Sequence, residues 1–175
     1  EWSNGEWWEE GKLVELDLSA NQLHSHIPDE LGNIETLRIL RLEGNELTGE
    51  IPTSLSNLSS LSRLDLRSNK LLGSIPENIG FLETIDTLSV SKNNLGCYEY
   101  DYACDPYGLN QECCSIHCDD IESCNGGIPE SLFNLSEVEH IDLQENNLSG
   151  GISENIDNLL SVERLYLNNN RLSGS

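Results

Sequence analysis

Apolar residues recur with a period of 24 residues along most of the chain. Aligned on them, the chain divides into units at 13–36, 37–60 and 61–84, a fourth that begins at 85–95 and resumes at 126–137, a fifth at 138–161 and an incomplete sixth at 162–175. The shared pattern is LxxLxLxxNxLxGxIPxxLxNLxx. Such a period indicates a stack of units, because no single unit can bury its own apolar face.

The start of each unit predicts a short β-strand. In LxxLxL the fourth and sixth positions point to the same side of an extended chain, so both can be buried. Stacked units place these strands side by side in one parallel sheet of six strands. The predicted inward residues are Leu16, Leu18, Leu40, Leu42, Leu64, Leu66, Leu88, Val90, Ile141, Leu143, Leu165 and Leu167.

Further recurring residues predict how each unit turns away from its strand. An asparagine follows each strand, and we expect these side chains to form a ladder that satisfies backbone groups at the inward turn. Glycine at the thirteenth position permits a tight turn. Ile-Pro pairs favour extended backbone on the far side. The asparagines are Asn21, Asn45, Asn69, Asn93, Asn146 and Asn170, and the glycines are Gly49, Gly73, Gly126, Gly150 and Gly174.

The pattern resembles the plant-specific class of leucine-rich repeat, which its GxIPxxLxxL half distinguishes from other classes. The resemblance covers about residues 13–175, apart from one insertion. It implies an α/β-type repeat fold, a right-handed solenoid with a parallel β-sheet on the concave face and irregular or 3-10 turns on the convex face. Members of the family include receptor-kinase ectodomains, inhibitors of cell-wall-degrading enzymes, and secreted proteins of algae and diatoms.

The two ends of the chain differ from the repeats. Residues 1–12 form an N-terminal cap segment that lacks the paired cysteines of plant caps and carries Trp2, Trp7 and Trp8. We interpret these tryptophans as an apolar lid over the first unit, with ligand stacking as the alternative. At the other end, Leu165 and Leu167 have no further unit above them. Because a solenoid needs a capping unit, we expect the natural protein to continue. Another hypothesis is that this uncovered end binds a second copy of the chain.

Residues 96–125 form an insertion that interrupts the fourth unit. It separates the repeats at 13–95, which end with the first part of that unit, from the remaining repeats at 126–175. This insertion holds all six cysteines and no lysine or arginine. So short a segment needs disulfides to hold it. The spacing C-x6-C-x8-CC-x3-C-x5-C resembles the inhibitor-cystine-knot (knottin) framework. Six cysteines allow 15 pairings, and the resemblance selects Cys97–Cys114, Cys104–Cys118 and Cys113–Cys124.

Other functions of the insertion remain open. Thiolates with His117 could bind zinc, although the usual C-x2-C pairs are absent. Asp119, Asp120 and Glu122 lack the spacing of known calcium loops, so no metal site is predicted. Tyrosine is favoured at interfaces, and this set of tyrosines either packs the insertion or contacts a partner. The tyrosines are Tyr98, Tyr100, Tyr102 and Tyr107.

Composition points to the secretory route. The formal charge of −22 argues against binding nucleic acid or anionic membranes over a broad surface. No apolar run of 18 residues exists, so this segment is not expected to insert into a membrane, and no signal peptide remains at its start. Three N-x-S/T sequons, at Asn57, Asn134 and Asn147, and the clustered cysteines predict a secreted or cell-surface glycoprotein.

Six of the nine basic residues fall at solvent-facing strand positions. Equal positions of successive units touch, and the charges alternate in sign, so one interpretation is mutual neutralisation of stacked side chains. The other is a recognition patch for a carboxylate or acidic peptide, facing a more acidic half in the later units. The candidate ligand-binding residues are Arg38, Arg41, Arg63, Asp65, Arg67, Lys92, His140, Asp142, Arg164 and Tyr166.

No nucleophile motif, phosphate-binding loop or dinucleotide fingerprint occurs, so neither enzymatic activity nor a cofactor is expected. The resemblance implies an extracellular recognition module that binds a protein, peptide or glycan on its concave face. Two alternatives are a structural, matrix or self-assembling cell-surface protein and a secreted inhibitor of a hydrolytic enzyme.

Overall fold

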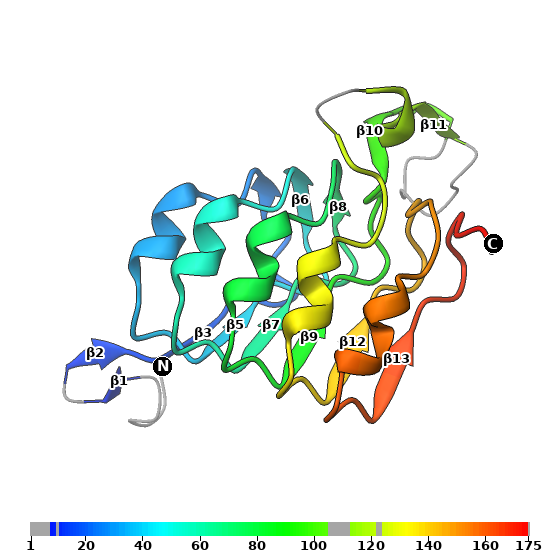
Figure 1. Cartoon of the computed structure of the whole chain (residues 1–175). Helices are drawn as coiled ribbons and strands as arrows, with labels where there is room; N and C mark the ends of the chain where they lie inside the picture. Colours follow the sequence, from blue (N-terminus) through cyan, green and yellow to red (C-terminus); the bar gives the residue numbers. More distant parts are fainter. Residues whose placement is uncertain (1–7, 10, 105–112, 122–123, 175) are drawn as a thin grey trace.

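The computed structural model describes residues 8–9, 11–104, 113–121 and 124–174 (Figure 1). The chain winds through stacked coils whose first strands form one parallel sheet of six strands. In order, these are β3 (Glu15–Asp17), β5 (Ile39–Arg41), β7 (Arg63–Asp65), β9 (Thr87–Ser89), β12 (His140–Asp142) and β13 (Arg164–Tyr166). The predicted solenoid and its six-stranded parallel sheet are confirmed.

The register of the sheet follows the leucine pattern. Leu40 of β5 pairs with Leu64 of β7, which pairs with Leu88 of β9. All three are fully buried, and the equivalent Leu16 and Leu165 in the outermost coils are partly buried. The inward set is therefore correct, and burial decreases toward the ends because those coils have a neighbour on one side only.

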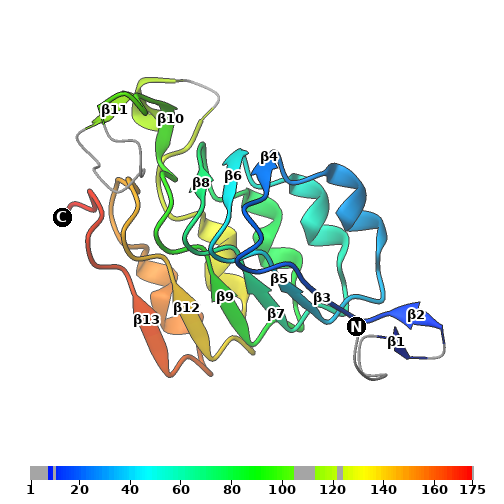
Figure 2. The same ribbon diagram turned by 180° about the vertical axis from the view of Figure 1, so that it is seen from behind.

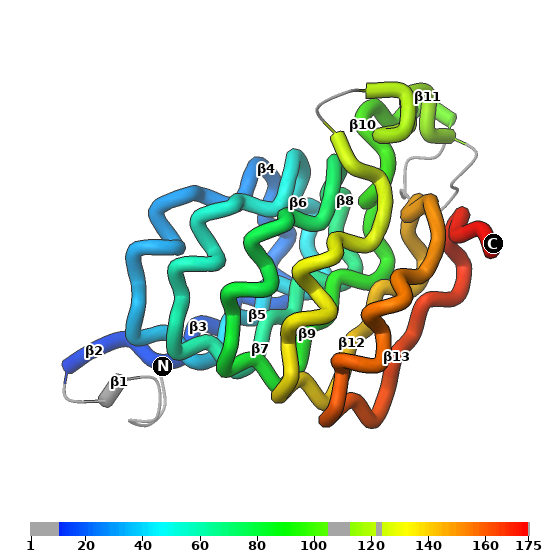
Figure 3. Tube along the Cα trace, viewed as in Figure 1, coloured from blue at the N-terminus to red at the C-terminus, as the bar shows by residue number. Residues whose placement is uncertain are grey.

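Opposite the sheet, each of the first five coils makes a short 3-10 helix (Figures 1 and 3). The turns are η1 (Asp29–Asn33), η2 (Thr53–Asn57), η3 (Glu77–Phe81), η6 (Glu130–Asn134) and η7 (Glu154–Asn158). A proline in extended conformation precedes each of the first four, for example Pro52 with ψ 132° before η2. The fixed φ of proline suits the residue that leads into such a turn.

The asparagine ladder lies between sheet and turns, as predicted. Asn69 Oδ1 accepts a hydrogen bond from Leu47 N at 3.0 Å in the preceding coil, and its Nδ2 donates to Leu42 O at 2.9 Å and Leu66 O at 3.1 Å. Asn93 repeats the arrangement one coil later. Each amide thus links two coils through backbone groups that are buried from water.

A second, smaller sheet was not predicted. It contains β4 (His24–Ser25), β6 (Glu46–Gly49) and β8 (Lys70–Leu71), which follow the asparagine of their coils. Gly49 and Gly73 have φ of 76° and 74°, as the tight turn at the thirteenth position requires. In the fourth coil the glycine with positive φ is Gly96, one position earlier, where the insertion begins.

The insertion leaves the solenoid without separating neighbouring coils. Gly96 N donates to Gly73 O at 2.7 Å where the chain departs, and Ser149 N donates to Gly126 O at 2.9 Å where it returns. Strands β9 and β12 pair directly across the interruption. Within the insertion, β10 (Cys97–Tyr100) and β11 (Cys114–His117) form an antiparallel hairpin, followed by the 3-10 turn η5 (Cys118–Asp120).

The N-terminal segment forms a small antiparallel pair from β1 (Trp8–Glu9) and β2 (Lys12–Leu13). The backbone of Trp8 lies opposite Leu13 of the first coil. Trp2 and Trp7 lie outside the described residues, so the tryptophan lid stays a prediction.

Candidate functional site

The outer face of the six-stranded sheet, called the sheet face below, carries the side chains of the third, fifth and seventh positions. Several of its charges pair between coils. Arg41 pairs with Glu15 and, at 3.5 Å, with Asp17, while Arg67 lies 2.9 Å from Glu43. Lys92 lies 3.9 Å from Glu145. Mutual neutralisation thus accounts for Arg41 and Lys92, although each such exposed pair stabilises the fold little.

One acidic group of the sheet face is fully buried. Asp65 is 0% exposed, at 3.2 Å from Arg67 and 3.4 Å from Arg63. Burial, together with a hydrogen bond to Glu43, raises the pKa of Asp65 to about 6, and the charge of Arg67 opposes this rise. The same hydrogen bond, with help from Arg67, lowers the pKa of Glu43. Asp65 and Glu43 therefore keep one shared proton at a higher pH than two isolated carboxyl groups would.

A hollow of about 250 Å³ opens beside this pair, over β7, β9, β12 and β13. It exists because β9 carries the small side chains of Thr87 and Ser89 between strands with long ones. Its charged and aromatic lining consists of Arg63, Asp65, Arg67, His140, Asp142, Arg164 and Tyr166.

Seven of the ten candidate ligand-binding residues thus lie together around one hollow. Arg38, Arg41 and Lys92 lie outside it. Sequence reasoning missed Thr87 and Ser89, which line the space, and Ser91, which donates a hydrogen bond to Asp142 beside it. The available signal was a run of small residues at three outward positions of the fourth unit.

Hydrogen bonds order the far side of the hollow. Ser91 Oγ donates to Asp142 at 2.8 Å. The Arg164 guanidinium lies 3.0 Å from His140 Nε2, which must accept because arginine only donates, so the ring proton is on Nδ1, 2.8 Å from Glu139 O. Arg63 Nε is buried without a hydrogen-bond partner in the described part of the chain.

Burial of Asp65 makes a testable prediction about pH. A carboxyl pKa raised from 3.8 to about 6 corresponds to roughly 3 kcal/mol of stability that is present below pH 4 and lost as the pH rises through 6. The isosteric variant Asp65→Asn is therefore expected to be about 1–3 kcal/mol more stable than the natural chain at pH 7.5 and equally stable at pH 4. Urea unfolding at both pH values measures this difference. A variant that is less stable at pH 7.5 would mean that the ion pairs with Arg63 and Arg67 outweigh the burial.

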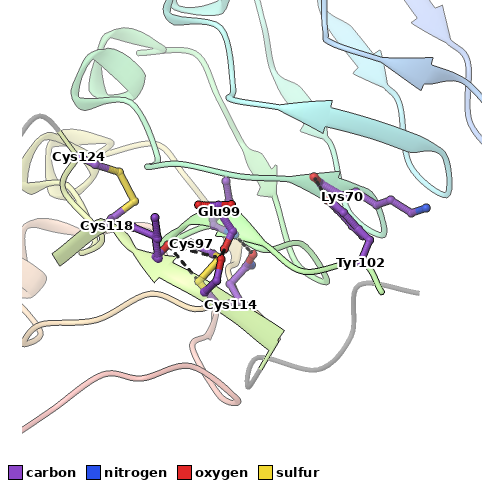
Figure 4. Close-up of a disulfide and its surroundings, with 11 residues drawn as sticks. Lys70, Cys97, Glu99, Tyr102, Cys114, Cys118 and Cys124 are labelled. Atoms are coloured by element: carbon purple, nitrogen blue, oxygen red, sulfur yellow. Dashed lines mark hydrogen bonds between the residues drawn. A yellow bond between two sulfur atoms is a disulfide. The ribbon is translucent and has the colours of Figure 1, made fainter. Parts of the chain in front are cut away.

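The tyrosines of the insertion are not one exposed surface. Tyr98 is 47% exposed, whereas Tyr100 is buried. Tyr102 packs on Tyr100 with ring centroids 5.0 Å apart, and its hydroxyl donates to Lys70 O at 3.2 Å (Figure 4). Tyr107 lies outside the described residues. Tyr100 and Tyr102 therefore hold the insertion together and against the third coil. Among the described tyrosines of the insertion, this leaves Tyr98 able to contact a partner.

The knottin pairing is wrong for two of three disulfides. The bridges are Cys97–Cys114, as expected, and Cys104–Cys113 and Cys118–Cys124. The β10–β11 hairpin brings Cys97 and Cys114 together, and each remaining bridge joins cysteines only nine or six positions apart. These nested and sequential links form no knot. All six sulfurs are bonded, which rules out the zinc-thiolate alternative, and no metal-binding group of three His, Cys, Asp or Glu occurs among the described residues.

The sequons fall into two classes. Asn57 and Asn134 are exposed, each at the last residue of a 3-10 turn. Asn147 is 0% exposed, and its carbonyl lies against Gly96 where the insertion begins. The folded coil has no room for a glycan there, so Asn147 is removed from the predicted glycosylation sites.

Comparison with known proteins agrees with the repeat analysis. A family model described as Leucine Rich Repeat matches residues 12–34, 36–58, 60–82 and 137–159. A search of curated proteins found no match. No helix among the described residues is both long and apolar enough to cross a membrane.

Solved structures from plants resemble the chain. The plant peptide hormone receptor RGFR1, in complex with RGF2, has a TM-score of 0.75 and 34% identity over 93% of this chain and 22% of that one. The ectodomain of the receptor kinase GASSHO1/SCHENGEN3 from Arabidopsis thaliana, in complex with CASPARIAN STRIP INTEGRITY FACTOR 2, has a TM-score of 0.73 and 28% identity over 92% of this chain and 16% of that one.

A shorter relative is matched over most of its length. The BIR2 ectodomain from Arabidopsis thaliana has a TM-score of 0.67 and 26% identity over 94% of this chain and 71% of that one. The chain thus spans about a fifth of the first two receptor structures and most of the third.

Proposed function

Because this chain belongs to the leucine-rich-repeat family, we propose that it is an extracellular recognition module that binds a peptide or protein ligand over the hollow of its sheet face. The observation that carries the proposal is the hollow itself. It gathers three arginines and a half-exposed tyrosine into one depression of the sheet face.

The lining favours a ligand that carries a carboxylate. Arg63 and Arg164 lie on the two sides of the hollow, and hydrogen bonds between guanidinium and carboxylate are among the strong, geometrically specific contacts of proteins. Asp142, between them, suits a donor group on the same ligand. The exposed ring of Tyr166 adds contact area that costs little side-chain entropy. A peptide with both a carboxylate and amide or amine donors fits this set.

Two further observations support an extracellular peptide receptor. RGFR1 is a plant peptide hormone receptor solved with RGF2, and its fold covers nearly the whole of this chain. Three disulfides and exposed sequons at Asn57 and Asn134 fit an oxidising, secretory environment. The inhibitor alternative has lost one of its supports, because the insertion is not a cystine knot.

Screening the whole chain against a library of peptides with free carboxyl termini tests the proposal. The tightest peptide is expected to bind Arg63→Gln about tenfold more weakly, because one charge-assisted hydrogen bond is lost. The same peptide with its C-terminal carboxylate converted to an amide should bind the natural chain about tenfold more weakly. Arg171→Gln is the matched control, since it removes the same charge from an exposed residue outside the hollow, and should stay within about twofold.

Titration calorimetry measures these affinities. A library that yields no binder, or binders whose affinity is the same for Arg63→Gln and Arg171→Gln, would contradict a carboxylate site in the hollow.

A further inference from the structure

A second depression lies on a different edge of the molecule, where the solenoid meets the insertion. Strands β4, β6 and β8 form a row along this edge, and β10 of the insertion continues the row (Figures 1 and 2). The chain just after β8 is joined to β10, because Gly73 N donates a hydrogen bond to Cys97 O at 2.8 Å. The row therefore runs from the first coil into the insertion.

A groove of about 750 Å³, called the edge groove, lies along this row. Its polar and aromatic lining comes from the first two coils and the insertion, namely His26, Asp29, Glu50, Thr53 and Tyr98. The buried Ile51 and the half-buried Leu72 contribute apolar surface. The groove is several times larger than a single side chain, so it has room for a short segment of chain.

Two glycines make the floor of the edge groove. A Cβ on Gly49 would lie 2.2 Å from the ring of His26, and one on Gly73 would lie 2.8 Å from Glu50 Cγ. His26 and Glu50 therefore lie flat across the glycine of the next coil instead of projecting outward. This arrangement holds an imidazole and a carboxylate at fixed places in the groove and keeps it open above them.

The charge of the edge groove has one sign. Asp29 and Glu50 contribute carboxylates, and neither lysine nor arginine occurs among the described lining residues. The lysine of this row, Lys70 of β8, lies 3.2 Å from Glu46 and 5.6 Å from the Tyr102 ring centroid, so it already has partners. At the end of the groove lies Tyr98, which is 47% exposed.

From this geometry we infer that the edge groove binds a basic peptide segment of a partner protein, with an arginine or lysine side chain placed between Glu50 and the ring of Tyr98. A carboxylate and an aromatic face that converge on one space are the two groups that hold a cationic side chain best. Apolar neighbours of that arginine or lysine pack on Ile51 and Leu72. The site depends on the insertion, because Tyr98 belongs to β10.

This site is separate from the hollow of the sheet face. The two depressions share no lining residue, and they favour ligand groups of opposite charge. One chain could therefore hold an acidic ligand end on its sheet and a basic partner segment at its edge. Failure of either binding experiment leaves the other site standing.

The probe for the test is the blocked peptide acetyl-Leu-Arg-Leu-Arg-Leu-amide, which has no terminal charges. Its citrulline analogue has the same shape without the positive charges. Binding of both to the whole chain is measured by calorimetry at about 0.15 M salt, where diffuse attraction between separated surface charges is largely screened.

The arginine peptide is expected to bind at least about tenfold more tightly than the citrulline peptide. Glu50→Gln and Tyr98→Leu should each weaken it by about fivefold, since one removes the carboxylate and the other keeps apolar bulk while removing the aromatic face. Glu154→Gln is the charge-matched control on an exposed residue of η7, outside the groove, and should change affinity by less than about twofold.

Equal weakening by Glu50→Gln and Glu154→Gln would mean that the peptide senses only the net charge of −22, and it would overturn the site. Equal affinity of the arginine and citrulline peptides, or unaltered binding to Tyr98→Leu, would also overturn it. Far-ultraviolet circular dichroism checks that each variant is folded, which the exposure of Tyr98 and Glu50 favours.

Discussion

Replacing Asn69 by alanine is expected to lower the free energy of unfolding by about 3–6 kcal/mol, the largest effect of any single substitution considered for this chain. The Asn69 amide satisfies one backbone N–H and two backbone carbonyls, in two coils, at distances of 2.9 to 3.1 Å. Asn69 is 5% exposed, so water cannot take over these bonds. Each buried group left without a partner costs about 1–3 kcal/mol.

Asn170→Ala is the matched control for this prediction. Asn170 makes the same three kinds of bond, to Leu148 N, Leu143 O and Leu167 O, in the outermost coil. It is only partly buried, so water can replace its amide, and the expected loss is about 1 kcal/mol. Urea unfolding followed by circular dichroism measures both variants. Similar losses at Asn69 and Asn170 would show that burial does not set the strength of the ladder.

Leu64→Ala is expected to cost about 2–5 kcal/mol. Leu64 is 0% exposed at the centre of the sheet, with Leu40 on one side and Leu88 on the other, so truncation leaves a cavity that neither neighbour can fill without moving its strand. The same substitution at Leu160, which is 82% exposed, should cost less than about 0.5 kcal/mol.

The difference between these two leucines is measured by urea unfolding of the whole chain. In a stack of coils each unit is stabilised mainly by its neighbours, so a central loss weakens contacts with two coils at once. A Leu64→Ala variant as stable as Leu160→Ala would contradict the register of the sheet.

The sequence predicts those parts of the molecule that repeat. Residues equivalent to Leu64 and Asn69 have the same structural roles in the other coils, because the 24-residue period repeats their surroundings. The pairing of Cys104 with Cys113 could not be predicted in this way, since the insertion occurs once and spacing alone leaves many pairings open.

The candidate sites show the same limit. The arginines of the hollow were identified from their strand positions, but the hollow depends on the size difference between Thr87 and its neighbours Arg63 and His140. The edge groove depends on how His26 lies across Gly49 and where β10 places Tyr98. Asn147 is buried although Gln22 and Glu46, at the same position of their units, are exposed, because the insertion begins beside it. The repeat pattern therefore does not predict contacts between a repeat and a segment that occurs only once.

The disulfides of the insertion also change the length of chain that joins the two halves of the fourth coil. Along the backbone, 30 residues run from Cys97 to Gly126. Through the Cys97–Cys114 and Cys118–Cys124 bridges, the covalent path contains only nine of them. In the oxidised unfolded chain, the connection between Leu95 and Gly126 is thus much shorter than in the reduced chain. The entropy lost when they meet is smaller than in the reduced chain by about 1 kcal/mol. Oxidation therefore offsets, before folding begins, part of the entropic cost of having an insertion inside a repeat.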